Sequence, residues 1–192
     1  MTEREVLALY EKTGALMHGH FKLTSGMHSG VYLQSALVLQ YPEYAEALGR
    51  ALGASFVDAG VTAVVAPAIG GIPVSHEVAR ALGARALFAE RENGVMTLRR
   101  GFTIAPGERC LVVEDVITTG GSTREVAACV ERQGGVVVGV GSLIDRSGGA
   151  ARFDVKRVAL ATVDALNYQP EACPMCKAGG TAIKPGSRSD RS

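Results

Sequence analysis

From residue 42 onward, continuous apolar runs alternate with runs in which apolar positions recur three and four residues apart. The first pattern predicts buried strands and the second predicts helices. The predicted strands are 62–66, 84–88, 110–114, 136–144 and 157–161, and the predicted helices are 42–59, 73–82 and 123–133. Strands and helices that alternate at this spacing form right-handed crossover units. The pattern therefore predicts an α/β fold with a parallel sheet flanked by helices.

The first 35 residues depart from this alternation. Thr2 and Glu5 have the spacing of a capping box, which predicts a short helix that ends near Gly14. Two short strands joined by a glycine-rich turn are predicted within residues 19–34. We therefore expect residues 1–35 to form a small hood beside the main core.

Composition narrows the class of protein. The chain has 192 residues, 47% hydrophobic and 20% charged, which suits one globular domain over residues 1–192 with a flexible tail at 183–192. A net charge of +1 gives no electrostatic footprint for nucleic acid. The apolar runs are too short to span a membrane, and the N-terminus lacks the apolar segment of a signal peptide. We expect a cytoplasmic protein that binds neither nucleic acid nor membranes.

The most informative segment runs from Leu111 to Ser122. Its apolar strand ends in two acids, Glu114 and Asp115, and a loop of hydroxyl residues and glycines leads into a predicted helix. In open parallel sheets ligands bind beyond the carboxyl ends of the strands. Glycines let backbone N–H groups close around a phosphate, and the helix N-terminus adds its dipole. Carboxylates beside such a pocket suit the hydroxyls of a ribose 5-phosphate and a water-coordinated Mg²⁺.

Other phosphate loops fit this segment less well. A nucleoside-triphosphate loop has a lysine directly after its glycines, and none is present here. Dinucleotide-binding folds place one acid about 20 residues after the glycines, whereas two acids precede them here. The remaining alternative is a strand–helix turn that carries its acids incidentally.

The run from Val112 to Ser122 resembles the phosphoribosyl pyrophosphate signature of the type I phosphoribosyltransferases. The resemblance implies the fold of that family. It also implies that Glu114 and Asp115 hold the ribose hydroxyls and lie near a Mg²⁺ ion that the substrate and water coordinate. The residues implied to bind phosphoribosyl pyrophosphate are Glu114, Asp115, Val116, Ile117, Thr118, Thr119, Gly120, Gly121, Ser122, Ile69, Gly70 and Arg91.

Wider similarity points to the orotate phosphoribosyltransferases within that family. Residues 19–26 resemble their hood segment, 66–73 their pyrophosphate loop, 142–146 a strand end with a base-binding arginine, and 184–188 the C-terminus of one bacterial subgroup. The resemblance implies a pentosyltransferase that converts orotate and phosphoribosyl pyrophosphate into orotidine 5-monophosphate and pyrophosphate, in pyrimidine biosynthesis.

Orotate is a planar carboxylate, and a guanidinium fork matches its oxygens. The resemblance accordingly implies that Arg146, Thr118 and Lys22 contact orotate. Without the resemblance, a surface salt bridge between Arg146 and Asp145 or Asp154 would be the simpler interpretation.

Residues 90–100 occupy the place of a mobile catalytic loop in the family. There the loop reaches across a dimer interface and covers the partner's active site, which implies a homodimer with shared sites. The catalytic residues implied are Arg91, Arg99 and Arg100 together with Asp115. The alternative is a solvated hairpin whose arginines have no special role.

Two functional alternatives stay open. The first is a phosphoribosyltransferase for another base, such as a purine, which an assay with a panel of bases would separate. The second is a non-catalytic regulator that senses phosphoribosyl pyrophosphate. A regulator of this kind needs a nucleic-acid-binding element, and no winged-helix-like extension is visible at the N-terminus.

Cysteines and histidines give a weaker signal. Cys110 and Cys129 fall in predicted strand and helix segments and are expected to be buried thiols. Cys173 and Cys176 have CxxC spacing, which suits a zinc half-site or a redox pair, although no second pair with ligand spacing accompanies them. The histidines of the hood segment are expected to be plain surface residues; they are His18, His20 and His28.

Overall fold

The computed structural model describes residues 1–23 and 25–185. A six-stranded sheet in the order β5-β4-β3-β6-β7-β8 forms its centre. All neighbouring strands in it are parallel except β5, which runs antiparallel to β4. The strands are β3 (Ala63–Pro67), β4 (Arg85–Glu92), β5 (Val95–Leu98), β6 (Arg109–Ile117), β7 (Val136–Asp145) and β8 (Arg157–Thr162). The predicted α/β fold is confirmed.

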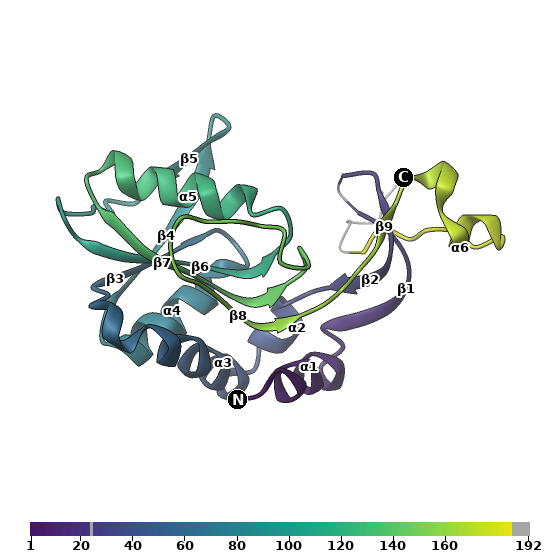
Figure 1. Cartoon of the computed structure of the whole chain (residues 1–192), viewed down its shortest axis with the longest axis horizontal. Helices are drawn as coiled ribbons and strands as arrows, with labels where there is room; N and C mark the ends of the chain where they lie inside the picture. Colours follow the sequence, from purple (N-terminus) through teal and green to yellow (C-terminus); the bar gives the residue numbers. More distant parts are fainter. Residues whose placement is uncertain (24, 186–192) are drawn as a thin grey trace.

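Helices cover both faces of this sheet (Figure 1). One face carries α1 (Glu3–Lys12), α2 (Ala36–Leu39), α3 (Pro42–Gly53) and α4 (Gly71–Leu82), and the other carries α5 (Gly121–Arg132). A 3-10 helix, η1 (Ala54–Ala59), continues α3 and ends at Gly60, whose φ of 58° is left-handed. The capping box predicted for α1 is present. The α1 side chains pack into the main core, so this helix does not belong to the hood.

Two hydrophobic cores sandwich the sheet. Strand β3 shows the alternation, because Val64 and Ala66 join the core under α3 and α4 while Ala63 and Val65 join the core under α5. A strand that is buried on both faces needs apolar residues at every position, which is why its sequence is a continuous apolar run. At the carboxyl end of β6, Glu114, Asp115 and Val116 are only partly buried, whereas Ile117 belongs to the core under α5.

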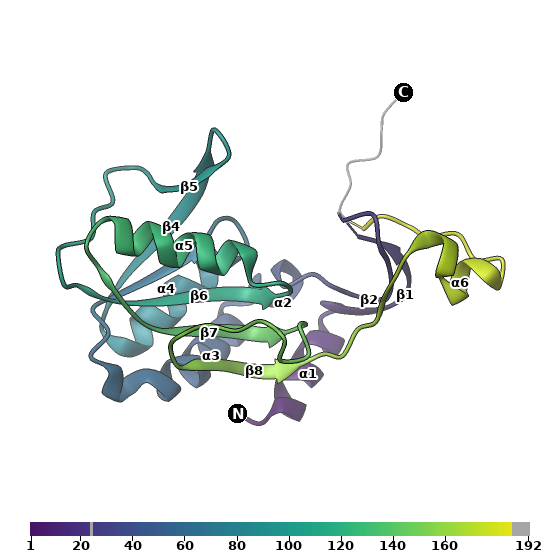
Figure 2. The ribbon, with the colours of Figure 1, turned by 45° about the horizontal axis from the view of Figure 1, so that its top comes forward.

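The hood is built from both ends of the chain. Strands β1 (Leu16–Lys22) and β2 (His28–Leu33) form the predicted hairpin, and the short β9 (Asn167–Tyr168) pairs with β2. After the 3-10 helix η2 (Pro170–Ala172) and the one-turn helix α6 (Pro174–Lys177), the chain returns to β1. Figure 2 shows this unit standing beside the main sheet.

This arrangement corrects two predictions. The hood is not confined to residues 1–35, since the chain from Asn167 onward completes it. The expected flexible tail does not begin at Ile183, which exchanges backbone hydrogen bonds with β1 on either side of Phe21. Residue 24 of the predicted hood segment and residues 186–192 of the predicted tail lie outside the described residues.

The segment 90–100 forms a hairpin between β4 and β5. Asn93 and Gly94 at its tip have φ of 51° and 83°. An Asn-Gly pair accepts these left-handed conformations at low cost, so it makes a tight turn that suits two antiparallel strands. Across the described residues, no helix is both long and apolar enough to cross a membrane.

Candidate active site

Two adjacent acids stand at the carboxyl end of β6, in the middle of the sheet. Glu114 and Asp115 lie just before the last two residues of the strand, which ends at Ile117. A Cβ atom added at Gly70 would lie 2.8 Å from both carboxylate oxygens of Asp115. The loop after β3, in which Ala68 and Ile69 are joined by a cis peptide bond, therefore meets the acid pair closely. The predicted pyrophosphate loop and the predicted ribose-binding acids share one site.

Burial dominates the electrostatics of the acid pair. Burial and, to a smaller extent, the neighbouring Asp115 raise the pKa of Glu114 to about 7, against the hydrogen bond that Glu114 accepts from the Thr123 hydroxyl. Burial also raises the pKa of Asp115, against a hydrogen bond from the Ser35 hydroxyl. Neither acid forms an ion pair with a described Lys or Arg. Two desolvated carboxylates without cations favour binding of hydroxyl donors or a hard metal ion.

We expect the free energy of unfolding of the ligand-free protein to depend on pH through Glu114. Its pKa is about 7 in the folded state against 4.5 ordinarily, so the folded protein holds this proton more tightly. The free energy of unfolding should then fall as pH rises from about 4.5 to beyond about 7. Glu114→Gln should reduce this slope, and the residual slope should carry the contribution of Asp115, which has the same sign. Urea unfolding of both proteins across this pH range tests the expectation.

The control for this measurement is Glu131→Gln, which removes a carboxylate from an exposed position of α5. It should leave the pH profile of the free energy of unfolding unchanged. Parallel profiles for the wild-type protein and Glu114→Gln would contradict the raised pKa.

The loop after β6 has the form of a phosphate site. Gly120 adopts a φ of 76°, which is open to glycine at little cost, and α5 begins at Gly121. Arg124 holds the loop from outside by donating to the Thr119 carbonyl oxygen at 2.9 Å. The Gly121 N–H donates to Thr119 Oγ1 at 3.4 Å, which is a long hydrogen bond. The N-terminus of α5 and the Thr118 and Thr119 hydroxyls together suit an anion. Ile117 is fully buried, so only its backbone can serve a ligand.

Arg146 lies beside this loop, at the edge of a cleft of about 580 Å³. Its Nη2 donates to Ser29 Oγ at 2.9 Å and to Asn167 Oδ1 at 2.8 Å. Its Nε is buried without a hydrogen-bond partner among the described residues, and burial lowers the pKa of the guanidinium. The cleft is lined by Thr118, Thr119, Arg146, Ser147, Gly148, Ala150, Ala151, Asp164, Ala165, Leu166 and Asn167.

The salt bridge considered for Arg146 is absent. Asp145 instead pairs with Arg157 and accepts hydrogen bonds from the Ser147 backbone and hydroxyl at 2.8 and 2.7 Å. Burial would raise the pKa of Asp145, but these hydrogen bonds and Arg157 hold it below its ordinary value. Among the described residues no carboxylate lies within ion-pair distance of Arg146. A half-buried cation without a counter-ion borders the cleft, and it suits an anionic ligand.

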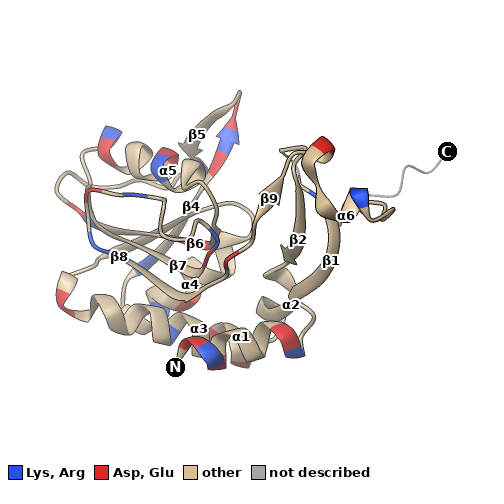
Figure 3. Cartoon of the chain, turned by 45° about the vertical axis from the view of Figure 1, so that its right-hand side comes forward, with Lys and Arg blue, Asp and Glu red and all other residues tan. Residues whose placement is uncertain are grey.

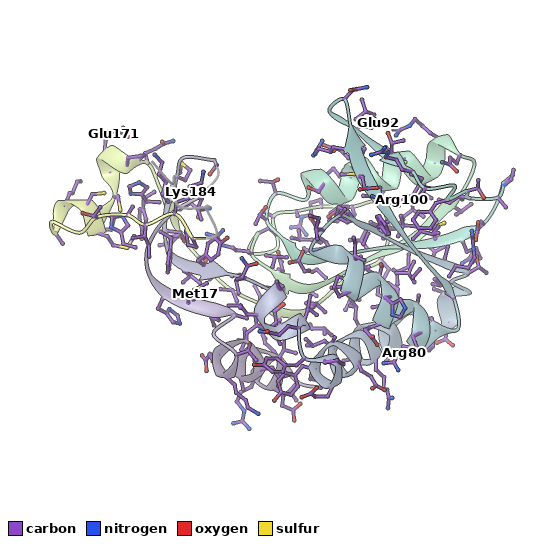
Figure 4. All side chains as sticks on the ribbon, turned by 180° about the vertical axis from the view of Figure 1, so that it is seen from behind. Met17, Arg80, Glu92, Arg100, Glu171 and Lys184 are labelled. Atoms are coloured by element: carbon purple, nitrogen blue, oxygen red, sulfur yellow. The ribbon has the colours of Figure 1, made fainter. Side chains whose placement is uncertain are left out.

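The three arginines of the predicted mobile loop do not line this cleft. Arg91 lies on β4, and Arg99 and Arg100 directly follow β5. The β4–β5 hairpin rises past α5 and carries charges of both signs (Figures 2 and 3). In Figure 4, Glu92 and Arg100 mark this hairpin, well apart from Glu171 and Lys184 on the hood. Each arginine pairs with a glutamate: Arg91 with Glu125 at 2.6 Å, Arg99 with Glu92 at 3.3 Å and Arg100 with Glu90 at 2.8 Å. Exposed pairs of this kind contribute little and exchange partners readily.

The structure differs from the sequence-based prediction of the orotate site at three other residues. Lys22 is exposed on β1 and does not line the cleft, so the structure does not bring it to Arg146. Ser29 and Asn167 hold Arg146, yet neither was a candidate. No motif could have found them, because they lie more than a hundred residues apart and meet only through the pairing of β2 with β9.

Paired acids, a glycine-rich phosphate loop and a facing cation on a parallel sheet define a sugar-phosphate-binding class of α/β proteins. The family model described as "Phosphoribosyl transferase domain" matches residues 38–167, and the chain belongs to this family. It is 61% identical over 188 residues to a protein of Pelotomaculum thermopropionicum named orotate phosphoribosyltransferase, covering 98% of this chain and 99% of that one.

Solved structures agree on the fold. The crystal structure of orotate phosphoribosyltransferase from Aeropyrum pernix matches with a TM-score of 0.67 at 28% identity, over 82% of this chain and 93% of that chain. Adenine phosphoribosyltransferase from Rhodothermus marinus matches with a TM-score of 0.64 at 23% identity, over 82% and 99%. Because enzymes for different bases share this fold, the fold alone does not select the base.

Proposed function

We propose that this protein is an orotate phosphoribosyltransferase, which transfers the phosphoribosyl group of phosphoribosyl pyrophosphate to orotate. The observation that carries the choice of base is Arg146, a half-buried guanidinium without an acidic partner at the edge of a cleft shared with Thr118 and Thr119. An uncompensated cation favours a base that carries a carboxylate over a neutral purine. The name of the Pelotomaculum relative supports the same choice.

The acid pair and the phosphate loop bind different parts of the sugar phosphate. Glu114 and Asp115 accept hydrogen bonds from the ribose hydroxyls, and the Thr118–Ser122 loop donates to the 5-phosphate. The same carboxylates supply the oxygen ligands that suit Mg²⁺, directly or through water. When bound, Mg²⁺ neutralises charge on the diphosphate leaving group. Gly70 lies against Asp115 and brings the Ile69–Gly70 backbone to the diphosphate side of the site.

Catalysis in this arrangement rests on positioning and charge. The bond from ribose C1 to the diphosphate breaks as the orotate nitrogen approaches, so positive charge develops on the ribose. Arg146 and Thr118 orient the ring of orotate in line, while Asp115 fixes the ribose. A cover that excludes water protects the reactive sugar from hydrolysis.

The test of this function is depletion of orotate, followed by its ultraviolet absorbance, with phosphoribosyl pyrophosphate and Mg²⁺ omitted in turn. Depletion that needs both supports the proposal. A panel of adenine, hypoxanthine and uracil run alongside identifies the base. Transfer to another base without transfer to orotate would overturn the choice of substrate but keep the family.

A substitution at Gly70 tests the contact with the acid pair. Its φ of −60° and ψ of −34° suit alanine, so any effect of Gly70→Ala comes from its methyl group, which would press on the Asp115 carboxylate. We expect the KM for phosphoribosyl pyrophosphate to rise about 10-fold, equal to about 1.4 kcal/mol, with a smaller change for orotate. Gly30→Ala is the control, because its methyl group would meet ordinary contacts at 3.9 Å or more. Equal effects of the two variants would contradict the close contact.

We further propose a cytoplasmic homodimer in which the β4–β5 hairpin of one subunit covers the site of the other. Within one chain, Arg91, Arg99 and Arg100 do not line the cleft. Their exposed ion pairs leave them free to turn to a partner's diphosphate. In a twofold dimer both hairpins would then act reciprocally.

Hybrid dimers test this cover. Asp115→Ala removes one subunit's sugar site, and Arg91→Ala removes the arginine that its hairpin contributes. If the hairpin acts on the partner, a mixture that has exchanged subunits should recover up to about a quarter of wild-type activity, because half the dimers carry one intact site. Light scattering and mass spectrometry verify dimers and exchange. No recovery after verified exchange would contradict the shared site.

A further inference from the structure

Four metal-ligating side chains meet in the hood. His20 comes from β1 and His28 from β2, while Cys173 directly precedes α6 and Cys176 lies within it. Their ligand atoms all lie within 4.8 Å of one another. The expectation that both histidines are plain surface residues is wrong, since His28 is only 6% exposed and His20 is half-buried. The second pair of ligands that the CxxC spacing lacked in the sequence is supplied by the hairpin.

The distances between these atoms fit the edges of a tetrahedron around zinc. Bonds of about 2.05 Å to nitrogen and about 2.3 Å to sulfur place two nitrogens about 3.4 Å apart, and a nitrogen and a sulfur about 3.6 Å apart. His20 Nε2 lies 3.0 Å from His28 Nδ1 and 3.4 and 3.6 Å from the sulfurs of Cys173 and Cys176. Cys176 Sγ lies 3.3 Å from His28 Nδ1. These four of the six edges are within about 0.4 Å of the zinc geometry. The other two edges, from Cys173 Sγ to Cys176 Sγ and to His28 Nδ1, are at most 4.8 Å long.

Hydrogen bonds alone account poorly for this cluster. A ring nitrogen of neutral histidine has either one proton or one lone pair, yet His20 Nε2 faces three polar atoms at 3.6 Å or less. The other nitrogen of this ring, Nδ1, is buried without a partner among the described residues. A cation at the centre would use the lone pairs of all four ligands at once. The cysteines are free thiols, and Cys173 is fully buried.

We propose that His20, His28, Cys173 and Cys176 form a structural Zn²⁺ site that fastens the C-terminal segment to the hood hairpin. Two sulfurs and two imidazole nitrogens in a tetrahedron select zinc among the common divalent ions. Four protein ligands leave no open position for a substrate, so the ion has a structural and not a catalytic role.

The hood buries few apolar side chains of its own, so a bound metal ion would add to its stability. Among residues 16–23, 25–33 and 167–185, none is a buried member of either hydrophobic core. Its buried apolar side chains are those of Phe21 and Cys173. A unit this small lacks the apolar burial that stabilises a fold by itself, and a structural metal commonly substitutes for it. The strands of the hood carry few charged residues that could form ion pairs instead (Figure 3).

The site also connects to the cleft. His28 directly precedes Ser29, which holds Arg146, and β2 pairs with the strand that carries Asn167, the second partner of Arg146. Zinc therefore positions the residues that hold Arg146. This part rests on the proposed function, whereas binding of zinc itself does not.

The first experiment measures zinc in the full-length, untagged and reduced protein by mass spectrometry of the dissolved metal. We expect one zinc per chain, and near-complete loss in Cys173→Ser and in Cys176→Ser. His18→Ala is the matched control, because His18 is exposed on the same strand as His20 and should leave the zinc content unchanged. Replacement by Co²⁺ should give the visible absorption of a tetrahedral ion and a thiolate charge-transfer band, both lost in the cysteine variants.

Hydrogen exchange provides a readout that does not depend on activity. Removal of zinc should speed exchange in residues 16–33 and 167–185 and leave the main sheet protected. The site would be overturned by a wild-type protein that binds neither zinc nor cobalt with its thiols reduced, by a Cys173–Cys176 disulfide in the purified protein without metal, or by equal zinc in Cys173→Ser. Zinc bound without any transfer to orotate would separate this inference from the proposed function.

Discussion

Asp115→Asn is expected to weaken binding of phosphoribosyl pyrophosphate by roughly 100-fold, about 3 kcal/mol. The substitution keeps the shape of the side chain and removes its charge. Asp115 is expected to accept two hydrogen bonds from the ribose hydroxyls, and each hydrogen bond to a charged acceptor contributes about 1.5 kcal/mol or more. Because Asp115 is buried, water cannot take the place of the lost carboxylate. Isothermal titration with phosphoribosyl pyrophosphate and Mg²⁺ measures the loss.

A stability measurement separates this loss from misfolding. Burial raises the pKa of Asp115, so the folded state bears the cost of the charged form above that pKa. Removal of the charge should leave the free energy of unfolding at pH 8 unchanged or higher. Asp154→Asn, at an exposed position outside the cleft, is the control and should bind as the wild type does. Unchanged affinity in Asp115→Asn would show that the acid pair does not hold the ribose.

The main sheet and the phosphate loop could be predicted because their signals are local. Strand β3 is a continuous apolar run since it is buried on both faces, and the Gly120–Gly121 turn follows from the left-handed φ that the loop requires. Glu114 and Asp115 could be placed because the carboxyl ends of parallel strands lie on one edge. The close contact of Gly70 with Asp115 follows from the same rule, but only the coordinates give its distance.

The hood could not be predicted in full because its contacts join distant parts of the chain. Strand β9 has two residues, too few for a periodic pattern, and its place is set by pairing with β2. His20 and His28 meet Cys173 and Cys176 across about 150 residues, so spacing within the sequence shows only half of the cluster. The ion-pair partners of Arg91, Arg99 and Arg100 could not be predicted either, because a polar segment of this kind is compatible with both a loop and a hairpin.

Arg146→Ala is expected to raise the KM for orotate roughly 100-fold, about 3 kcal/mol, with little change in the KM for phosphoribosyl pyrophosphate. The guanidinium is half-buried and has no acidic partner, so an orotate carboxylate gains a strong, poorly screened contact there. Arg146→Lys should recover only part of the loss, because an ammonium cannot donate through a planar fork. Initial rates with each substrate varied in turn measure both constants.

Asn167→Ala distinguishes contact from positioning. Asn167 accepts from Nη2 of Arg146 at 2.8 Å, while Ser29 Oγ, at 2.9 Å from the same nitrogen, remains in the variant. Since a single neutral-to-charged hydrogen bond contributes about 1.5 kcal/mol, its loss should raise the KM for orotate about 10-fold, less than loss of Arg146 itself. Equal losses for orotate and phosphoribosyl pyrophosphate in Arg146→Ala would instead mean that the guanidinium holds the loop or the diphosphate, and the base would have to be recognised elsewhere in the cleft.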